Sequence, residues 1–331
     1  MRTISLIGLV YAATYGGLLE TRAQDHEQKR AYHAGADASI ILRCIDQDGQ
    51  PVADAVVSSA LYPDGSLINA IVNNGNTESN GLFAIKGKTN GEYSFGLTKS
   101  GYYKTRMVRH LSREKAATVI SGRWQPYGMT NTVVLKRIVN PVAMHVKWNS
   151  LKNFFPSQGM LYGYDMEAGD WVKPFGKGIV ADFHARHERR TGAKPLEITT
   201  SLTLLFTNAM DGAYCMKADT SGSAMKTVIR ANTNALYLKE FVFTYERTPG
   251  KVRTNTYPTL ADYFVLRTRT EVDEHGAIKR AHYAKIVGKC EVAKSDRFDF
   301  FYYFNPNTND PNLEADTTRN LLNPRDLGFA P

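Results

Sequence analysis

Cysteine is scarce in this sequence: three residues among 331, at positions 44, 215 and 290. They are not spaced like the ligands of a zinc site, so their spacing predicts no zinc module. Cys215 and Cys290 both lie in the second half of the chain and would be the natural disulfide pair in an oxidising compartment, although no bridge at all is equally compatible with three scattered cysteines. Cys44 alternates with Ile40 and Leu42, which predicts a buried thiol on a strand.

Long apolar runs are also missing, except at the start of the chain. Ile4–Leu19 follows Arg2, and Thr21-Arg22-Ala23 supplies a small-x-small cleavage site. The run is shorter than the roughly 20 residues of a membrane span. We therefore predict a signal peptide over residues 1–23 and an exported protein, periplasmic, cell-surface or extracellular, with no transmembrane segment in the mature chain. A buried N-terminal helix is the alternative.

Catalytic and nucleotide-binding signatures are absent. The sequence has no Gly-x-Ser-x-Gly, no Walker loop and no Gly-x-Gly-x-x-Gly, so it predicts neither a recognisable nucleophile nor a cofactor. It has no Asn-x-Ser/Thr sequon, which is compatible with a bacterial source. The net charge of +9 favours acidic partners such as anionic polysaccharide, or gives a solvated basic face; export makes nucleic acid the least expected partner.

What the sequence does contain is a series of short apolar stretches separated by Gly, Asn, Asp and Pro. Residues 24–37 read as a leader or linker. Beyond them the predicted strands are Ser39–Ile45, Leu82–Lys86, Tyr93–Thr98, Tyr102–Arg109 and Asn131–Arg137. Short strands at this spacing are typical of a β-sandwich.

Four motifs follow one another in this region: Asp48-Gly49-Gln50-Pro51-Val52, Glu78-Ser79-Asn80-Gly81-Leu82-Phe83, Gly91-Glu92-Tyr93 and Gly101-Tyr102. Their order resembles the carboxypeptidase regulatory-like (transthyretin-like) domain. The resemblance implies a seven-stranded, transthyretin/Ig-like sandwich over residues 38–138, used as a non-catalytic spacer or attachment module. Gly81 is expected to turn the chain so that Phe83 points into the core. The segment His110–Gly128 departs from the family as a long basic insertion.

The second half, residues 142–331, is again rich in strand patterns and predicts a second β-sandwich-like domain of unknown function, which makes the whole chain all-β. The predicted strands are Val180–Arg186, Glu197–Thr207, Leu236–Tyr245, Phe264–Val272, Ile278–Val287 and Phe298–Phe304. Alternation along Phe264–Val272, followed by a turn at Asp273–Gly276, predicts a β-hairpin with Ile278–Val287. A short helical turn is expected around Leu313–Leu322.

Carboxylates and aromatic residues gather at the start of this second region. Asp165, Asp170 and Asp182 are weak candidates for the acid and base of a glycoside hydrolase, which needs two carboxylates flanking a sugar. Trp171 and Tyr164 are candidate rings for binding a sugar. The alternative is an acidic, solvent-facing turn with a buried tryptophan.

Two further groups are candidates for binding. Arg267, Arg269 and Lys279 fall on the predicted hairpin, where they could hold a polyanion or could protect an edge strand from aggregation. Oxygen-bearing side chains also cluster near the C-terminus, with Asn307, Asn309 and Asp310 as weak Ca²⁺ candidates. Turn formation is the commoner use of such residues, and no metal is predicted.

Together these features favour an exported, non-catalytic binding or surface-structural protein whose partner is a glycan or an envelope protein. A secreted polysaccharide hydrolase is one alternative. Another is a subunit of an extracellular assembly that joins its neighbours by β-strand addition. The sequence leaves the oligomeric state open.

Overall fold

The computed structural model describes residues 25–111, 118–149, 154–194, 197–251, 254–256, 262–292, 296–325 and 327–328. The predicted signal peptide, residues 1–23, lies outside the described residues. No helix among these segments combines the length and the apolar character needed to cross a membrane.

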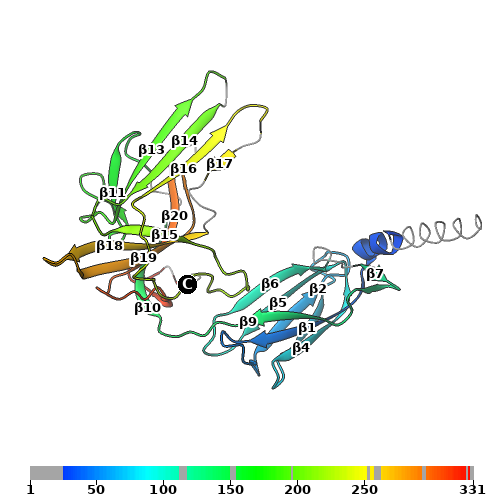
Figure 1. Ribbon diagram of the computed structural model, residues 1–331. Helices are drawn as coiled ribbons and strands as arrows, with labels where there is room; N and C mark the ends of the chain where they lie inside the picture. The colour runs from blue at the N-terminus through cyan, green and yellow to red at the C-terminus, as the bar shows by residue number, and fades with distance from the viewer. Residues whose placement is uncertain are drawn as a thin grey trace, which may run out of the picture. The chain divides into compact units, whose positions relative to one another are not determined.

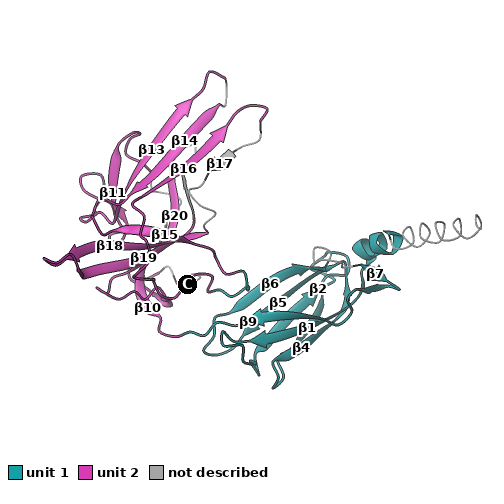
Figure 2. Cartoon of the chain, in the orientation of Figure 1, with its two compact units in different colours: residues 1–138, 220–224 teal, residues 139–219, 225–331 magenta. Residues whose placement is uncertain are grey.

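The chain forms two compact units (Figure 2). Unit 1 comprises Met1–Ile138 and Thr220–Ala224, and unit 2 comprises Val139–Asp219 and Met225–Pro331. Strands build both units (Figure 1), which confirms the all-β prediction.

Unit 1 is a sandwich of two sheets. One sheet contains β4 (Leu82–Thr89), β1 (Ala36–Ile45), β8 (Arg123–Trp124) and β7 (Val119–Ile120) in that order, with β9 (Met129–Val134) also paired to β1. The other runs β3 (Ile71–Asn76), β2 (Val56–Leu61), β5 (Glu92–Thr98) and β6 (Thr105–His110). Inward-facing apolar residues of both sheets form one core, against which Phe83 packs as expected.

This unit has nine strands within its described residues, where seven were expected. The extra pair, β7 and β8, comes from the predicted insertion, and Trp124 anchors it: the buried indole donates a hydrogen bond to the carbonyl oxygen of Thr89 at 2.8 Å. Residues 25–34, which lie in the predicted leader or linker, form a helix. Ala31 of this helix is buried in the core, and the ring of Tyr32 lies 5.9 Å from that of Trp124.

Unit 2 contains two six-stranded sheets. The first has the order β15 (Gly212–Met216), β18 (Tyr263–Val272), β19 (Ile278–Val292), β20 (Phe298–Asn305), β10 (Val142–Asn149) and β21 (Ala315–Asn320). The second has the order β12 (Asp170–Trp171), β11 (Leu161–Asp165), β13 (Phe183–Thr191), β14 (Ile198–Leu205), β16 (Glu240–Arg247) and β17 (Thr254–Thr256). Aromatic residues from both sheets, Phe183 and Phe300 among them, share one core.

The predicted hairpin is present: β18 and β19 pair antiparallel. The expected helical turn around Leu313–Leu322 is wrong, because β21 pairs with β10 there. The Asn320 side chain replaces part of the ladder, accepting a hydrogen bond from Val146 N at 3.1 Å and donating one to Val146 O at 2.9 Å. Long-range pairing thus outweighs the local helical pattern.

Two turn glycines of unit 1 give a matched test of close packing. Gly49 and Gly81 share a φ of +76°, but a Cβ on Gly49 would meet nothing, whereas one on Gly81 would lie 2.4 Å from Cys44 O. We expect Gly49→Ala to destabilise unit 1 by about 1 kcal/mol through backbone strain and Gly81→Ala to cost at least about 1 kcal/mol more because the backbone must also move. Urea unfolding measures both, and equal effects would contradict this packing.

Candidate functional site

Arg269 lies at a β-bulge in β18 and is the centre of the site. Its φ is +52°, and the pairing of β18 with β19 shifts register between Thr268 and Glu271. A bulge breaks the alternation of side chains along a strand and redirects the extra residue. The guanidinium therefore lies mostly buried rather than on a solvent face.

Asp211 holds the bulge open. Its carboxylate accepts hydrogen bonds from the backbone N–H groups of Arg269, at 3.0 Å, and Thr270, at 2.9 Å. Asn208 donates to the Thr270 carbonyl oxygen at 2.7 Å. These side chains satisfy backbone groups that the bulge removes from the ladder.

The guanidinium of Arg269 joins three carboxylates at the edge of the opposite sheet: Asp165 at the end of β11, Glu167 in the turn after it and Asp182 just before β13. We call these four residues the Arg269 cluster. Nε lies 2.8 Å from Asp182 Oδ1 and Nη2 lies 3.0 Å from Asp182 Oδ2, a bidentate pair. Nη2 also donates to Asp165 Oδ1 at 2.9 Å, and Nη1 bonds Glu167. The guanidinium carbon stands 4.9 Å from the ring centre of Phe304. The cluster thus cross-links the two sheets of unit 2.

The buried carboxylates of the cluster have opposite pKa shifts. Burial opposes ionisation of Asp165, but hydrogen bonds from the N–H groups of Ile179, Ala168 and Val180, together with Arg269, outweigh it and lower the pKa. Asp182 is more deeply buried, and burial raises its pKa against the pull of Arg269.

This geometry corrects the hydrolase hypothesis. The carboxylates of Asp165 and Asp182 do not flank an open cleft, because one guanidinium bonds both of them. Asp170 uses its oxygens locally, accepting hydrogen bonds from Trp171 N at 2.9 Å and Lys177 N at 3.1 Å. All three side chains therefore shape the loops around β11 and β12.

The proposed sugar-binding rings are buried too. Trp171 is 4% exposed and Tyr164 is fully buried, and their ring centres lie 5.3 Å apart within the core between the sheets. The indole N–H of Trp171 donates to Phe154 O at 2.9 Å. Neither ring can present a face to a ligand, so the alternative of a buried tryptophan holds.

The basic hairpin surface is not formed either. The guanidinium of Arg267 is stacked 4.2 Å from the ring centre of Tyr237 and donates to Met210 O at 2.9 Å and Thr233 O at 3.3 Å. Arg269 points to its carboxylates, and of the three expected residues Lys279 is the exposed one. The reason is that residues 231–237 cover the β18 face that the alternation placed in solvent.

The C-terminal oxygen cluster serves local structure. Asn309, with φ +62°, accepts a hydrogen bond from Ala281 N at 2.9 Å and donates one to Lys279 O at 3.0 Å. Asp310 accepts from Asn305 Nδ2 at 3.0 Å, and the backbone N–H of Asn307 donates to Asn305 Oδ1 at 2.9 Å. These contacts favour the turn interpretation over a Ca²⁺ site.

Cys44 is fully buried, as expected, and burial raises the pKa of its thiol to about 12. The Cys290 side chain lies outside the described residues, so a bond from it to Cys215 stays a prediction.

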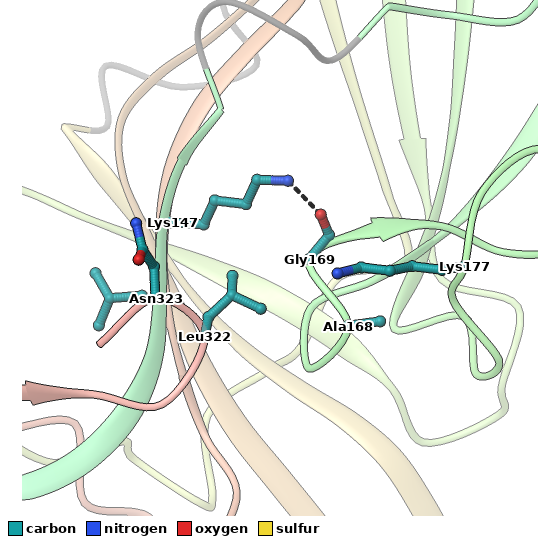
Figure 3. Close-up of a pocket in the computed structure, with 7 residues that line it drawn as sticks. Lys147, Ala168, Gly169, Lys177, Leu322 and Asn323 are labelled. Carbon is teal, nitrogen blue, oxygen red and sulfur yellow. Dashed lines mark hydrogen bonds between the residues drawn. The ribbon is translucent and has the colours of Figure 1, made fainter. Parts of the chain in front are cut away.

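A pocket of about 310 Å³ in unit 2 was not anticipated from the sequence (Figure 3). Its lining includes Lys147 of β10, Gly169 and Lys177 of the loops flanking β12, and Leu322 and Asn323 beyond β21. These residues come from three distant parts of the chain, so no local motif signals the pocket.

No family model matches the sequence, and no curated protein does. Solved structures give weak likenesses. A 3-chlorocatechol 1,2-dioxygenase from Rhodococcus opacus is 13% identical with a TM-score of 0.26, over 32% of this chain and 62% of that one. The shaft pilin SpaA of Lactobacillus rhamnosus is 13% identical with a TM-score of 0.23, and the match covers 54% of this chain and 90% of that one. The major pilin subunit BcpA of Bacillus cereus is 13% identical with a TM-score of 0.21, and the match covers 84% of this chain and 100% of that one. Similarity at this level carries no argument about this chain's function.

Removing Arg269 should strongly destabilise unit 2. Arg269→Met leaves the Asp182 and Asp165 carboxylates buried without their cation, which typically costs about 3–5 kcal/mol. Arg280→Met is the matched control, because its 3.3 Å pair with Glu271 is exposed and such pairs contribute under about 1 kcal/mol. Urea denaturation compares the two, and similar losses would show that the cluster is not a main stabiliser.

The folded protein should become less stable in mild acid, partly because the buried His187 resists protonation. Its side chain is fully buried beside Phe155, and neither ring nitrogen has a hydrogen-bond partner among the described residues, although Asp296 lies 3.3 Å from Nδ1. Burial lowers the pKa of His187 below 6.5, and the positive charge of Arg189 lowers it further. These effects outweigh the negative charges of Asp296 and Glu188, which raise the pKa.

The unfolded chain then binds the proton more readily, so the contribution of His187 is present above pH 6.5 and is lost as the pH falls below that value. We expect His187→Phe to lose less stability than the wild type between about pH 7 and pH 5. Thermal unfolding at each pH measures this, and parallel curves for both proteins would rule His187 out.

Proposed function

We propose that the protein is an exported structural subunit that assembles with further copies of itself by adding a strand at β3. The observation that carries this proposal is the chemistry of that strand. β3, with the sequence Ile-Val-Asn-Asn-Gly-Asn, is the end strand of its sheet and has no charged residue.

Three other end strands, β4, β6 and β21, have charges of the kind that commonly block strand addition, whereas the end strands β9, β15 and β17 are uncharged like β3. β4 has Lys86 and Lys88, β6 has Arg106 and Arg109, and β21 has Asp316 and Arg319. The outer edge of β6 is also occupied, since Arg106 N donates to Gly222 O at 3.1 Å and Ala224 N to Lys104 O at 2.8 Å.

Apolar side chains gather next to β3. Leu67 and Ile68, in the loop before the strand, are largely exposed, and Ile71 and Val72 of the strand itself are exposed as well. Exposed apolar groups beside an unpaired strand edge favour association with another chain. The Asn73 side chain, which accepts a hydrogen bond from Lys86 N at 3.2 Å, joins β3 to β4 but leaves these apolar groups in solvent.

The core of unit 2 supports a structural rather than a hydrolytic role. The carboxylates expected to catalyse hydrolysis bond Arg269 or nearby backbone N–H groups. A buried cross-link between sheets suits a load-bearing module, whereas a hydrolase needs its acid and base to face the substrate.

Val72 and Val108 provide a matched pair for the test. Both belong to one row of paired residues across the sheet, Val72–Ala60–Ser94–Val108, and they are 59% and 54% exposed. We expect Val72→Lys, which places a charge on the open edge, to raise the concentration needed for self-association about tenfold. Val108→Lys, beside the occupied edge, should leave it unchanged.

Light scattering over a concentration series of residues 24–331 measures the association. A wild-type chain that stays monomeric throughout, or a Val72→Lys variant that associates like the wild type, would overturn the proposal. Equal weakening by both substitutions would also count against it, because the face of the sheet rather than its edge would then be the contact.

A further inference from the structure

The pocket of unit 2 contains two lysines, Lys147 and Lys177. Lys147 donates a hydrogen bond to the carbonyl oxygen of Gly169, and in Figure 3 Lys177 reaches toward the same turn from the other side. Neither ammonium group forms an ion pair with a carboxylate within the described segments. The Asp170 carboxylate accepts hydrogen bonds from two backbone N–H groups, those of Trp171 and Lys177.

The electrostatics around Lys147 favour an added negative charge. Burial lowers the pKa of Lys147, Asp170 raises it, and the positive charge of Lys177 lowers it further. An anion placed between the two lysines would relieve this repulsion and form charge-assisted hydrogen bonds.

The pocket's size and remaining walls limit what can fill it. About 310 Å³ is at the lower end of small-molecule sites, which suits one sugar ring or a smaller ligand. Val146, Ala168 and Leu322 supply apolar contacts, and the Asn323 amide supplies a donor and an acceptor. Gly169 keeps the space open, since a Cβ there would lie 2.6 Å from Leu322 Cδ2.

We propose that this pocket binds a compact oxyanion-bearing ligand, such as an acidic sugar, between the ammonium groups of Lys147 and Lys177. This site is independent of the strand-addition surface, because the pocket belongs to unit 2 and β3 belongs to unit 1. The result of one test therefore does not decide the other.

Methyl NMR of residues 24–331 provides the test, since Val146, Ala168 and Leu322 place methyl groups in the pocket. The probes are D-glucuronate, inorganic phosphate and, as a neutral control, D-glucose. We expect an anion to shift these three methyl resonances, glucose not to shift them, and added salt to weaken the effect. Shifts with both anions would identify the oxyanion as the recognised group, whereas shifts with glucuronate alone would identify a sugar acid.

Lysine variants locate the binding. Lys147→Met keeps much of the apolar stem and should weaken anion binding about tenfold, as expected for loss of a hydrogen bond between charged groups. Lys177→Met, which changes an exposed side chain, should also weaken it and keeps the test valid if Lys147→Met fails to fold. Lys239→Met is the matched control, because Lys239 also donates to a backbone carbonyl in unit 2, that of Asn208, outside the pocket.

The proposal would be overturned by the absence of any shift of these methyl groups with either anion, by equal shifts with glucose, or by unchanged anion affinity in both pocket variants. If Lys239→Met lost as much anion affinity as Lys147→Met, the proposal would also be overturned, because the positive charge of the whole protein rather than the pocket would then explain the binding.

Discussion

The ion pairs between Arg269 and the carboxylates of Asp182 and Asp165 join the two sheets of unit 2 at a point where neither side has access to much water. A charge in such a place is tolerated only when its partners are near and correctly oriented. The bulge in β18, its support by Asp211 and the turns after β11 all contribute to that orientation. Much of the local structure of unit 2 therefore depends on where this guanidinium lies.

The same cluster organises the loops that line the pocket. Asp165 accepts backbone hydrogen bonds from residues on both sides of β12, including Ala168 at 3.0 Å and Ile179 at 2.8 Å. Met166, next to it, donates its N–H to Asp182 at 2.7 Å and accepts from the Tyr302 hydroxyl at 2.8 Å. Gly169 and Lys177 lie within the stretch held in this way, so an interior ion pair shapes a surface feature.

The fold of unit 1 is stabilised by other interactions than the ion pairs of unit 2. In its described part the apolar residues form one core without a cluster like that of Arg269, and its precision comes from turns and close backbone approach, as at Gly81 beside Cys44. Its exposed features are the uncharged edge of β3 and the apolar loop before it. In both units the interior is occupied by structural contacts, which places the proposed functions, assembly and anion binding, at an edge and in a surface pocket.

The sequence by itself determined the strand-rich class, the β18–β19 hairpin and the buried state of Cys44, because each depends on alternation or turn chemistry within a few residues. The assignment of Arg267 and Arg269 to a binding surface was wrong. Alternation shows which residues share a strand face, but it shows neither what covers that face, as at Arg267, nor where a bulge redirects a side chain, as at Arg269. The partner of Arg269, Asp182, is 87 residues away, and the ring under Arg267 belongs to a loop before β16. Only the tertiary structure decided these contacts, since pairing across such distances results from how sheets and loops pack and leaves no local pattern in the chain.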